Sequence, residues 1–266
     1  MKRTDNTSIA SIVTTDDTEF PQCVFCEHTY LSYCCQECPS REEPMPEHPS
    51  ECKHCKLQKL ADAFIQAFNF CVSRPDFLHE ALIVDLRRFE DQTDVSFFHQ
   101  YVYVVLNAGM KNWIAEGIYD RCVNDGCFES GRFNCVRHVS KRRAIEFVFT
   151  RYRRVFQKLT EANDKLAYLT TLPWIGDITK FHLARNLGLD YAKPDRHMVR
   201  LAVQFGYLSS FKELATASSR LFGCSSSNEL VTAVALLCQD VAKMFGMRVG
   251  TVDLILWRWL SSGGAP

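Results

Sequence analysis

The sequence lacks a long apolar run. No stretch of about 18 residues has the composition of a transmembrane helix, and the mean hydropathy is −0.14. Residues 1–17 lack the apolar centre of a signal peptide and turn acidic, so we expect an intracellular protein, cytoplasmic in a prokaryote or nuclear in a eukaryote, with no membrane partner. Alternating apolar and polar residues, the pattern of strands, are scarce, and 12 glycines in 266 residues exclude a collagen-like chain. Because 47% of the residues are hydrophobic, a buried core is possible and a wholly disordered chain is excluded.

The sequence has no excess of either charge, with 31 basic and 31 acidic side chains, but these charges are unevenly distributed. Residues 1–99 hold 17 acidic and 9 basic side chains, whereas residues 141–200 hold 13 basic and 6 acidic ones. The basic segment is typical of a surface that faces a polyanion, and it is also compatible with solvated helix faces. Its basic residues include Lys141, Arg142, Arg143, Arg151, Arg153, Arg154, Lys158, Lys180, Arg185, Arg196 and Arg200.

The chain divides into three parts by composition. Residues 1–20 are polar, and we expect a mobile tail. Residues 21–56 are rich in cysteine, proline and glutamate and have too few aliphatic residues for a core, so a metal ion is the expected cross-link. Residues 57–266 show helical periodicity, which predicts a mainly α domain. The predicted helices begin at residue 57 and continue over 98–110, 144–159, 163–171, 177–187, 195–205, 211–222, 229–245 and 251–260, although the run 101–106 is also compatible with a strand.

Three C-x2-C pairs lie within 33 residues. A two-residue gap lets both thiolates of one turn reach the same ion, and two such pairs complete a tetrahedral site, so we expect structural Zn²⁺. An iron–sulfur cluster, a second metal ion and reduced, unligated cysteines are the alternatives. The expected ligands are Cys23, Cys26, Cys35, Cys38, Cys52 and Cys55, with Cys34 and the histidines His28, His48 and His54 nearby. The scattered cysteines Cys71, Cys122, Cys127, Cys135, Cys224 and Cys238 are expected to be buried small apolar residues.

The most specific motif is the segment LTTLPWIGDITKFHLARNLGLDYAKPDRHMVR, residues 169–200. One predicted helix runs into a turn closed by Gly176, and a second helix starts near Asp177. Such a turn presents backbone N–H groups at a helix N-terminus, which makes a phosphate site without any base-reading side chain. The residues expected to contact DNA here are Leu172, Pro173, Trp174, Ile175, Gly176, Thr179 and Lys180.

This segment resembles the helix-hairpin-helix of the DNA glycosylase superfamily that includes endonuclease III. The family pattern is L-P-G-hydrophobic-G and a helix, followed by an Asp shortly before a His and an Arg. Here Trp174 stands at the first glycine, and Asp195 follows the hairpin one residue earlier than in the endonuclease III type. The resemblance implies a helical glycosylase-like fold that acts as a monomer on double-stranded DNA. The K-P-D-R-H sequence of residues 193–197 is most similar to a subgroup linked to hypermodified pyrimidines of phage DNA. This subgroup contains the helical domains of the α-glutamyl/putrescinyl thymine pyrophosphorylases and of the hydroxymethyluracil kinases. Anti-phage glycosylases that act on modified bases are a related possibility.

A second stretch, residues 103–112, resembles the early helix and turn of these glycosylases. In the family this turn carries the residues that fill the gap left by the extruded base. Gly109 stands where the family usually has Gln, so the resemblance implies that Met110, Lys111 or Asn112 fills the gap.

The resemblance also implies a catalytic role for Asp195. An enzyme that cleaves an N-glycosidic bond rotates the nucleotide out of the duplex, and a carboxylate then stabilises the oxocarbenium-like sugar. Asp195 also has the position of a helix N-cap, and the two roles are compatible. Family members that cut the strand use a Lys for a Schiff base; that position is Ile178 here, and Lys180 lies about 200° further around the helix. We therefore predict a monofunctional glycosylase, with Arg200 as a phosphate clamp or a partner of an acid.

Two other functions fit the same residues: a non-catalytic DNA-binding module and a group-transfer enzyme that acts on modified thymine.

Three further residues have structural interpretations. His182 is expected to be a structural or surface histidine. Asp253 is expected to be a first-turn helix acid with Thr251 as its cap, and Asp85 to lie in a solvated acidic and basic region.

Overall fold

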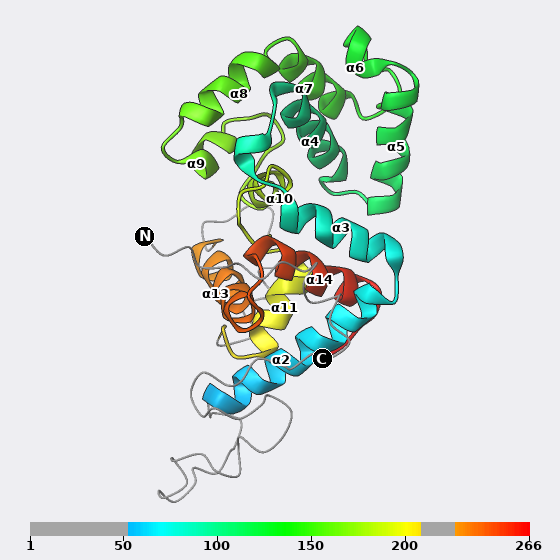
Figure 1. Ribbon diagram of the computed structural model, residues 1–266. Helices are drawn as coiled ribbons and strands as arrows, with labels where there is room; N and C mark the ends of the chain where they lie inside the picture. Colours follow the sequence, from blue (N-terminus) through cyan, green and yellow to red (C-terminus); the bar gives the residue numbers. More distant parts are fainter. Residues whose placement is uncertain (1–52, 209–226) are drawn as a thin grey trace, which may run out of the picture. The chain divides into compact units, whose positions relative to one another are not determined.

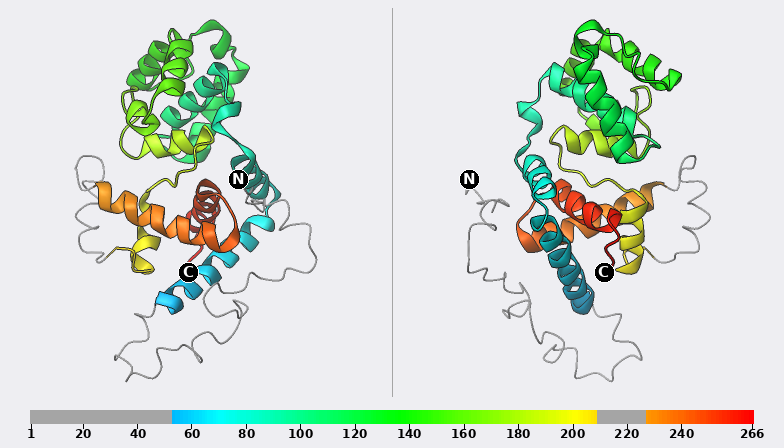
Figure 2. Two further views of the ribbon diagram at one scale, coloured as in Figure 1. Left: turned by 60° about the vertical axis from the view of Figure 1, so that its left-hand side comes forward. Right: turned by 90° about the vertical axis from the view of Figure 1, so that its right-hand side faces the viewer.

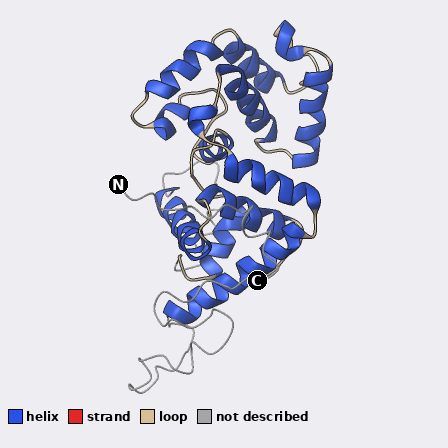
Figure 3. Ribbon diagram, in the orientation of Figure 1, coloured by secondary structure: helices blue, strands red, loops and turns tan. Residues whose placement is uncertain are grey.

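The computed structural model describes residues 53–208 and 227–266 (Figure 1). In these two ranges every regular element is a helix and no strand occurs, so the predicted mainly α class is confirmed (Figure 3). The run 101–106 is helical. Three predictions lie outside the described part of the chain: the tail, the helix 211–222, and the side chains of the proposed zinc ligands from Cys23 to Cys55.

No single helix of the described ranges combines the length and the hydropathy of a membrane span. The helices α13 (Ser227–Phe245) and α14 (Val249–Ser261) reach the required length and hydropathy only as a pair, and they are bent by 105° at their junction.

The described residues fall into two compact units. The first unit contains α2 (Lys53–Val72), α3 (Pro75–Leu86), α11 (Arg196–Gln204), α13 and α14. Its central helix is α14, drawn in red in Figure 2, which contacts each of the other four helices. The sequence of α14 is almost entirely apolar, and a helix that is apolar all round is stable only when other helices cover every side. This composition explains why α14 is the central helix of the unit.

The structure of α3 and α14 corrects two predictions, which concern Asp85 and Thr251. The hydroxyl of Thr251 donates to the carboxylate of Asp85 over 3.0 Å, and both side chains are buried. Asp85 is therefore not solvated. Thr251 is not a cap either, because α14 begins at Val249 and Arg248 occupies the N-cap position.

The second unit spans residues 87–193 and is built around α4 (Asp94–Asn107). A capping box at Thr93 starts this helix, and its apolar residues are buried on nearly all sides. Helices from four other parts of the unit contact α4, which makes it the scaffold for the loops described below. They are α5 (Asn112–Asn124), α7 (Val139–Phe149), α8 (Tyr152–Glu161) and α10 (Thr179–Asn186), and the short helices α6 (Cys127–Ser130) and α9 (Lys165–Leu169) complete the unit.

One predicted helix is interrupted in the structure. The single helix expected over 144–159 is two helices, α7 and α8, with a break at Thr150 and Arg151. The Thr150 hydroxyl and the Arg151 guanidinium both donate to the carbonyl of Phe147, which ends α7 without a glycine or proline. The helices α3 and α5 were not anticipated from the sequence.

Candidate functional site

The predicted hairpin is present between α9 and α10. The backbone N–H of Leu172 bonds the carbonyl of Leu169 over 3.1 Å, and that of Ile175 bonds the carbonyl of Leu172 over 3.1 Å. The side chains of Leu172 and Ile175 belong to the hydrophobic core of the unit. These two residues therefore anchor the turn from within, and they leave Trp174 and Gly176 exposed.

Trp174 has a left-handed backbone with φ +65°, and no other non-glycine residue of the described ranges has a positive φ. This conformation is the one that a glycine adopts without strain, so the chain keeps it where the family pattern has glycine. Three contacts hold it in place. The Tyr101 hydroxyl donates to the carbonyl of Pro173 over 2.9 Å. The rings of Trp174 and His138 meet edge to face at 5.3 Å, and the Lys141 ammonium lies 5.4 Å from the indole centroid.

Lys141 is 2% exposed although it begins a basic run. Its ammonium donates to the carbonyls of Leu106 (2.8 Å) and Ala108 (2.7 Å) at the end of α4, and burial lowers the pKa of Lys141. Since the same ammonium faces Trp174, one lysine supports both the hairpin and the turn after α4. This role of Lys141 was not predicted, because in the sequence Lys141 is one basic residue among several.

Gly176 is not required by the conformation of its own backbone. Its φ lies outside the left-handed region, and a Cβ added there would meet nothing within 4 Å. Its N–H donates to the Thr179 hydroxyl over 2.7 Å. Glycine at such an open position allows another backbone or a ligand to approach closely. Beside it, Lys180 forms an ion pair of 3.6 Å with Asp177, the residue that precedes α10.

The turn between α4 and α5 carries the predicted gap-filling residues. Gly109 reverses the chain with φ +69°. Met110 packs against the hydrophobic core, and the amide of Asn112 bonds Glu116 and the Tyr103 hydroxyl. Lys111 is exposed. The neighbouring Trp113 is 68% exposed, which is the largest value among the large apolar residues of the described ranges, and it was not anticipated.

Asp195 lies in the first unit and is the N-cap of α11. Its Oδ1 atom accepts hydrogen bonds from the backbone N–H groups of His197 (2.9 Å) and Met198 (3.3 Å), so the predicted capping role is confirmed. The side chain of Asp195 is half-buried, and Arg200 on the same helix is exposed.

His182 on α10 is a buried structural residue. Burial and the positive charges of Lys193 and Arg185 hold the pKa of His182 well below its usual value of 6.5, so the ring is neutral near neutral pH. It meets the Tyr103 ring edge to face at 6.1 Å.

The helices α7 and α8 present part of the predicted basic surface. The guanidinium of Arg151 covers the Phe147 ring at 4.0 Å, and Arg153 pairs with Asp94 over 3.4 Å. These contacts leave the charges at the surface, in the same unit as the hairpin. The exposed basic residues of the two helices and of the break between them are Arg143, Arg151, Arg153, Arg154 and Lys158.

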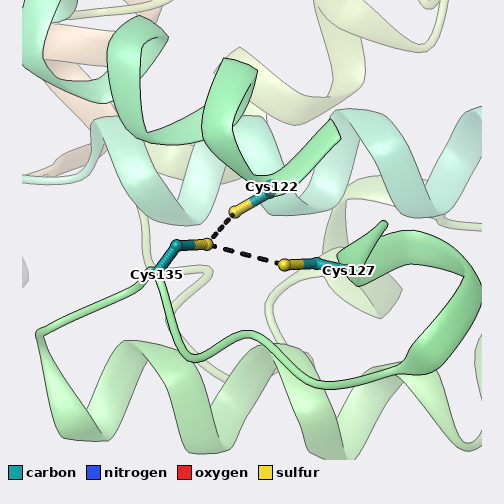
Figure 4. A group of neighbouring side chains, drawn as sticks. All are labelled: Cys122, Cys127 and Cys135. Atoms are coloured by element: carbon teal, nitrogen blue, oxygen red, sulfur yellow. Dashed lines mark hydrogen bonds between the residues drawn. The ribbon is translucent and has the colours of Figure 1, made fainter. Parts of the chain in front are cut away.

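Three of the cysteines that were expected to be isolated converge in the second unit. The sulfur atoms of Cys122, Cys127 and Cys135 lie within 4.8 Å of one another and point toward a common centre (Figure 4). Burial and the neighbouring thiols raise the pKa of Cys122 and raise that of Cys127 to about 11. These three residues could hold a metal ion. Their irregular spacing in the sequence hid the cluster.

The sequence matches no family model and no curated protein. A solved structure does match: the 8-oxoguanine glycosylase/lyase of Methanocaldococcus jannaschii, in complex with a 15mer DNA containing 8-oxoguanine. The match covers 78% of this chain and 100% of that chain, with a TM-score of 0.57 and 14% sequence identity. At this identity the likeness concerns the fold. The chain therefore has a fold similar to that of this DNA glycosylase/lyase, and the predicted glycosylase-like helical fold is confirmed.

Proposed function

We propose that the chain is a DNA glycosylase that removes a modified base from double-stranded DNA. The observation that carries the proposal is the hairpin turn, in which Trp174 keeps the left-handed backbone of a glycine and Gly176 leaves open space above the chain. The backbone N–H groups at the N-terminus of α10 would bind a phosphate, as helix N-termini do. The likeness in fold to the 8-oxoguanine glycosylase/lyase supports this role. Such a protein acts where DNA is, in the cytoplasm of a prokaryote or the nucleus of a eukaryote, as a monomer.

Asp195 would supply the chemistry. A carboxylate beside C1′ of an extruded nucleotide stabilises the positive charge that develops as the base departs. The capping bonds that Asp195 makes fix the orientation of its carboxylate. We expect a hypermodified pyrimidine of phage DNA as the substrate, because residues 193–197 resemble that subgroup.

The decisive experiment replaces Asp195 with asparagine. Asparagine is as good an N-cap as aspartate, so Asp195→Asn keeps the fold and removes only the charge. We expect base release to fall by about 100-fold or more, with DNA binding retained. Release is measured as alkali-labile abasic sites in duplexes that carry hypermodified pyrimidines, 8-oxoguanine or unmodified bases. Asp164→Asn is the matched control, since Asp164 caps α9 by the same kind of bond, and it keeps full activity.

The same assay distinguishes the other two candidate functions. A DNA-binding module would bind every duplex and cut none, and Asp195→Asn would be silent. A group-transfer enzyme would leave an altered base attached to its sugar, which mass spectrometry of the nucleosides detects. Either outcome would refute the glycosylase.

The absence of strand cleavage is part of the proposal. Ile178 cannot form a Schiff base, and the nearby Lys180 is engaged by Asp177. Borohydride treatment during turnover is therefore expected to give no covalent protein–DNA adduct, and a strong adduct would contradict the monofunctional mechanism.

The hairpin is tested by binding alone. A methyl group at residue 176 fits the fold, but it would fill the space that the DNA backbone needs. We expect Gly176→Ala to fold normally and to weaken binding of duplex DNA about tenfold, a loss of about 1.4 kcal/mol. Gly117→Ala is the control, since Gly117 is exposed on α5 with open space around it. Equal affinity of the two variants would exclude the hairpin as the binding site.

A further inference from the structure

The cysteine cluster described above is assembled from three segments of the second unit. Cys122 lies near the end of α5, Cys127 begins α6, and Cys135 lies in the irregular segment before α7. The Cys135 sulfur is 3.0 Å from that of Cys122 and 3.6 Å from that of Cys127. Cys122 and Cys127 are buried, whereas Cys135 is half-buried. The cluster is thus closed on the side of the core and open at Cys135.

The spacing of the sulfur atoms fits coordination of one metal ion. Around a tetrahedral zinc ion, Zn–S bonds of about 2.3 Å place neighbouring sulfurs about 3.8 Å apart. The Cys135 sulfur lies 3.0 Å and 3.6 Å from the other two, slightly closer than this value, and all three sulfurs lie within 4.8 Å of one another. Shifts of well under an ångström for each sulfur therefore suffice to bind zinc.

The backbone around the cluster has little regular structure of its own. The four-residue helix α6 is bounded by Gly126 (φ +62°) and Gly131 (φ +71°), both left-handed. Gly126 turns the chain immediately before Cys127 and so directs this residue back toward α5. A segment with so few helical hydrogen bonds gains more from a cross-link than a long helix does.

We propose that Cys122, Cys127 and Cys135 together bind one zinc ion as thiolates, with the fourth position open to water on the side of Cys135. Each coordinating thiol releases its proton to solvent. Zinc is favoured over an iron–sulfur cluster because three thiolates and one open position suit a single ion, whereas clusters are held by four cysteines. This site is separate from the C-x2-C pairs of residues 23–55.

The site would also support the hairpin. Cys135 precedes His138 by three residues, and the His138 ring packs against Trp174. The His138 side chain also accepts a bond from the N–H of Lys141 at the start of α7. The zinc ion would therefore fix the segment that carries one of the three contacts of Trp174.

The test measures zinc in the full-length protein, purified under reducing conditions, by mass spectrometry of the metal. Cys135→Ser is expected to hold one zinc ion fewer per chain than the wild type, whatever the residues 23–55 bind. Cys71→Ser is the control, since Cys71 is a buried free cysteine of the other unit, and it keeps the full content. Equal zinc content in all three proteins would overturn the proposal. So would a disulfide between Cys122 and Cys135 in the protein as purified.

A second measurement needs no variant. The wild type is pulsed with N-ethylmaleimide, with and without a zinc chelator, and modification is followed for each cysteine-containing peptide. Cys135 is expected to react at least tenfold faster after chelation, while Cys238, buried in the other unit, stays protected and reports that the fold is intact. An unchanged rate at Cys135 would also overturn the proposal.

Discussion

The left-handed tryptophan of the hairpin allows a sharp test of the backbone argument. Trp174→Ala and Trp174→Gly both remove the ring and its contacts with His138 and Lys141, which together are worth about 2 kcal/mol. They differ in one respect. Alanine retains the cost of about 1–2 kcal/mol that an L-residue has at φ +65°, whereas glycine avoids it and loses about 0.5–1 kcal/mol of backbone entropy. Trp174→Gly should therefore be more stable than Trp174→Ala by about 1 kcal/mol.

Urea unfolding followed by circular dichroism measures this difference directly, and thermal unfolding should show it as about 2–4 °C. The pair Trp113→Ala and Trp113→Gly is the control. Trp113 is exposed in the first turn of α5, where glycine is less favourable than alanine, so the order of the two variants reverses. If Trp174→Ala proves as stable as Trp174→Gly, the backbone of residue 174 is not left-handed in solution, and the conformation described for this turn is wrong.

Three further predictions concern the supporting structure. Gly188→Ala should cost about 3 kcal/mol or more, because its Cβ would lie 2.5 Å from the carbonyl carbon of Arg88 at φ +85°; normal urea stability would contradict this. Burial lowers the pKa of His182 in the folded state. The stability that the neutral His182 ring contributes is therefore fully present above the unfolded-state pKa near 6.5 and is lost as the pH falls below it. His182→Gln should flatten the loss of stability between pH 6.5 and 5.5 by up to about 1.4 kcal/mol, and an unchanged slope would exclude a buried neutral imidazole. Thr251→Val should cost about 1–2 kcal/mol by removing the hydroxyl donor to Asp85, whereas Thr251→Ser keeps it; equal stabilities would show that the bond contributes nothing.

Periodicity in the sequence predicted the helices whose apolar residues face one core. The helix expected over 98–110 corresponds to α4, and that over 251–260 to α14. The break between α7 and α8 was missed because apolar residues keep helical spacing across Thr150 and Arg151, both of which are exposed. Helix α3 was missed because its apolar residues do not gather on one face.

The hairpin and the cap at Asp195 could be predicted because both are local. A turn and a helix start depend on residues a few positions apart, which the sequence displays directly. The support of the hairpin could not be predicted, since Tyr101 and Lys141 lie about 70 and 30 residues before it and reach it only in the folded chain. The cysteine cluster escaped detection for the same reason, because Cys122, Cys127 and Cys135 lack the spacing of a knuckle.

The anchors of Trp174 restrict the order in which substitutions at this turn can accumulate. A tryptophan introduced at this position into a related protein that lacks Tyr101, His138 and Lys141 would bear the left-handed strain with no compensating contact. The tryptophan is therefore less destabilising once the anchors are present, and a hairpin transplanted into another scaffold is more stable when its three supports are moved with it.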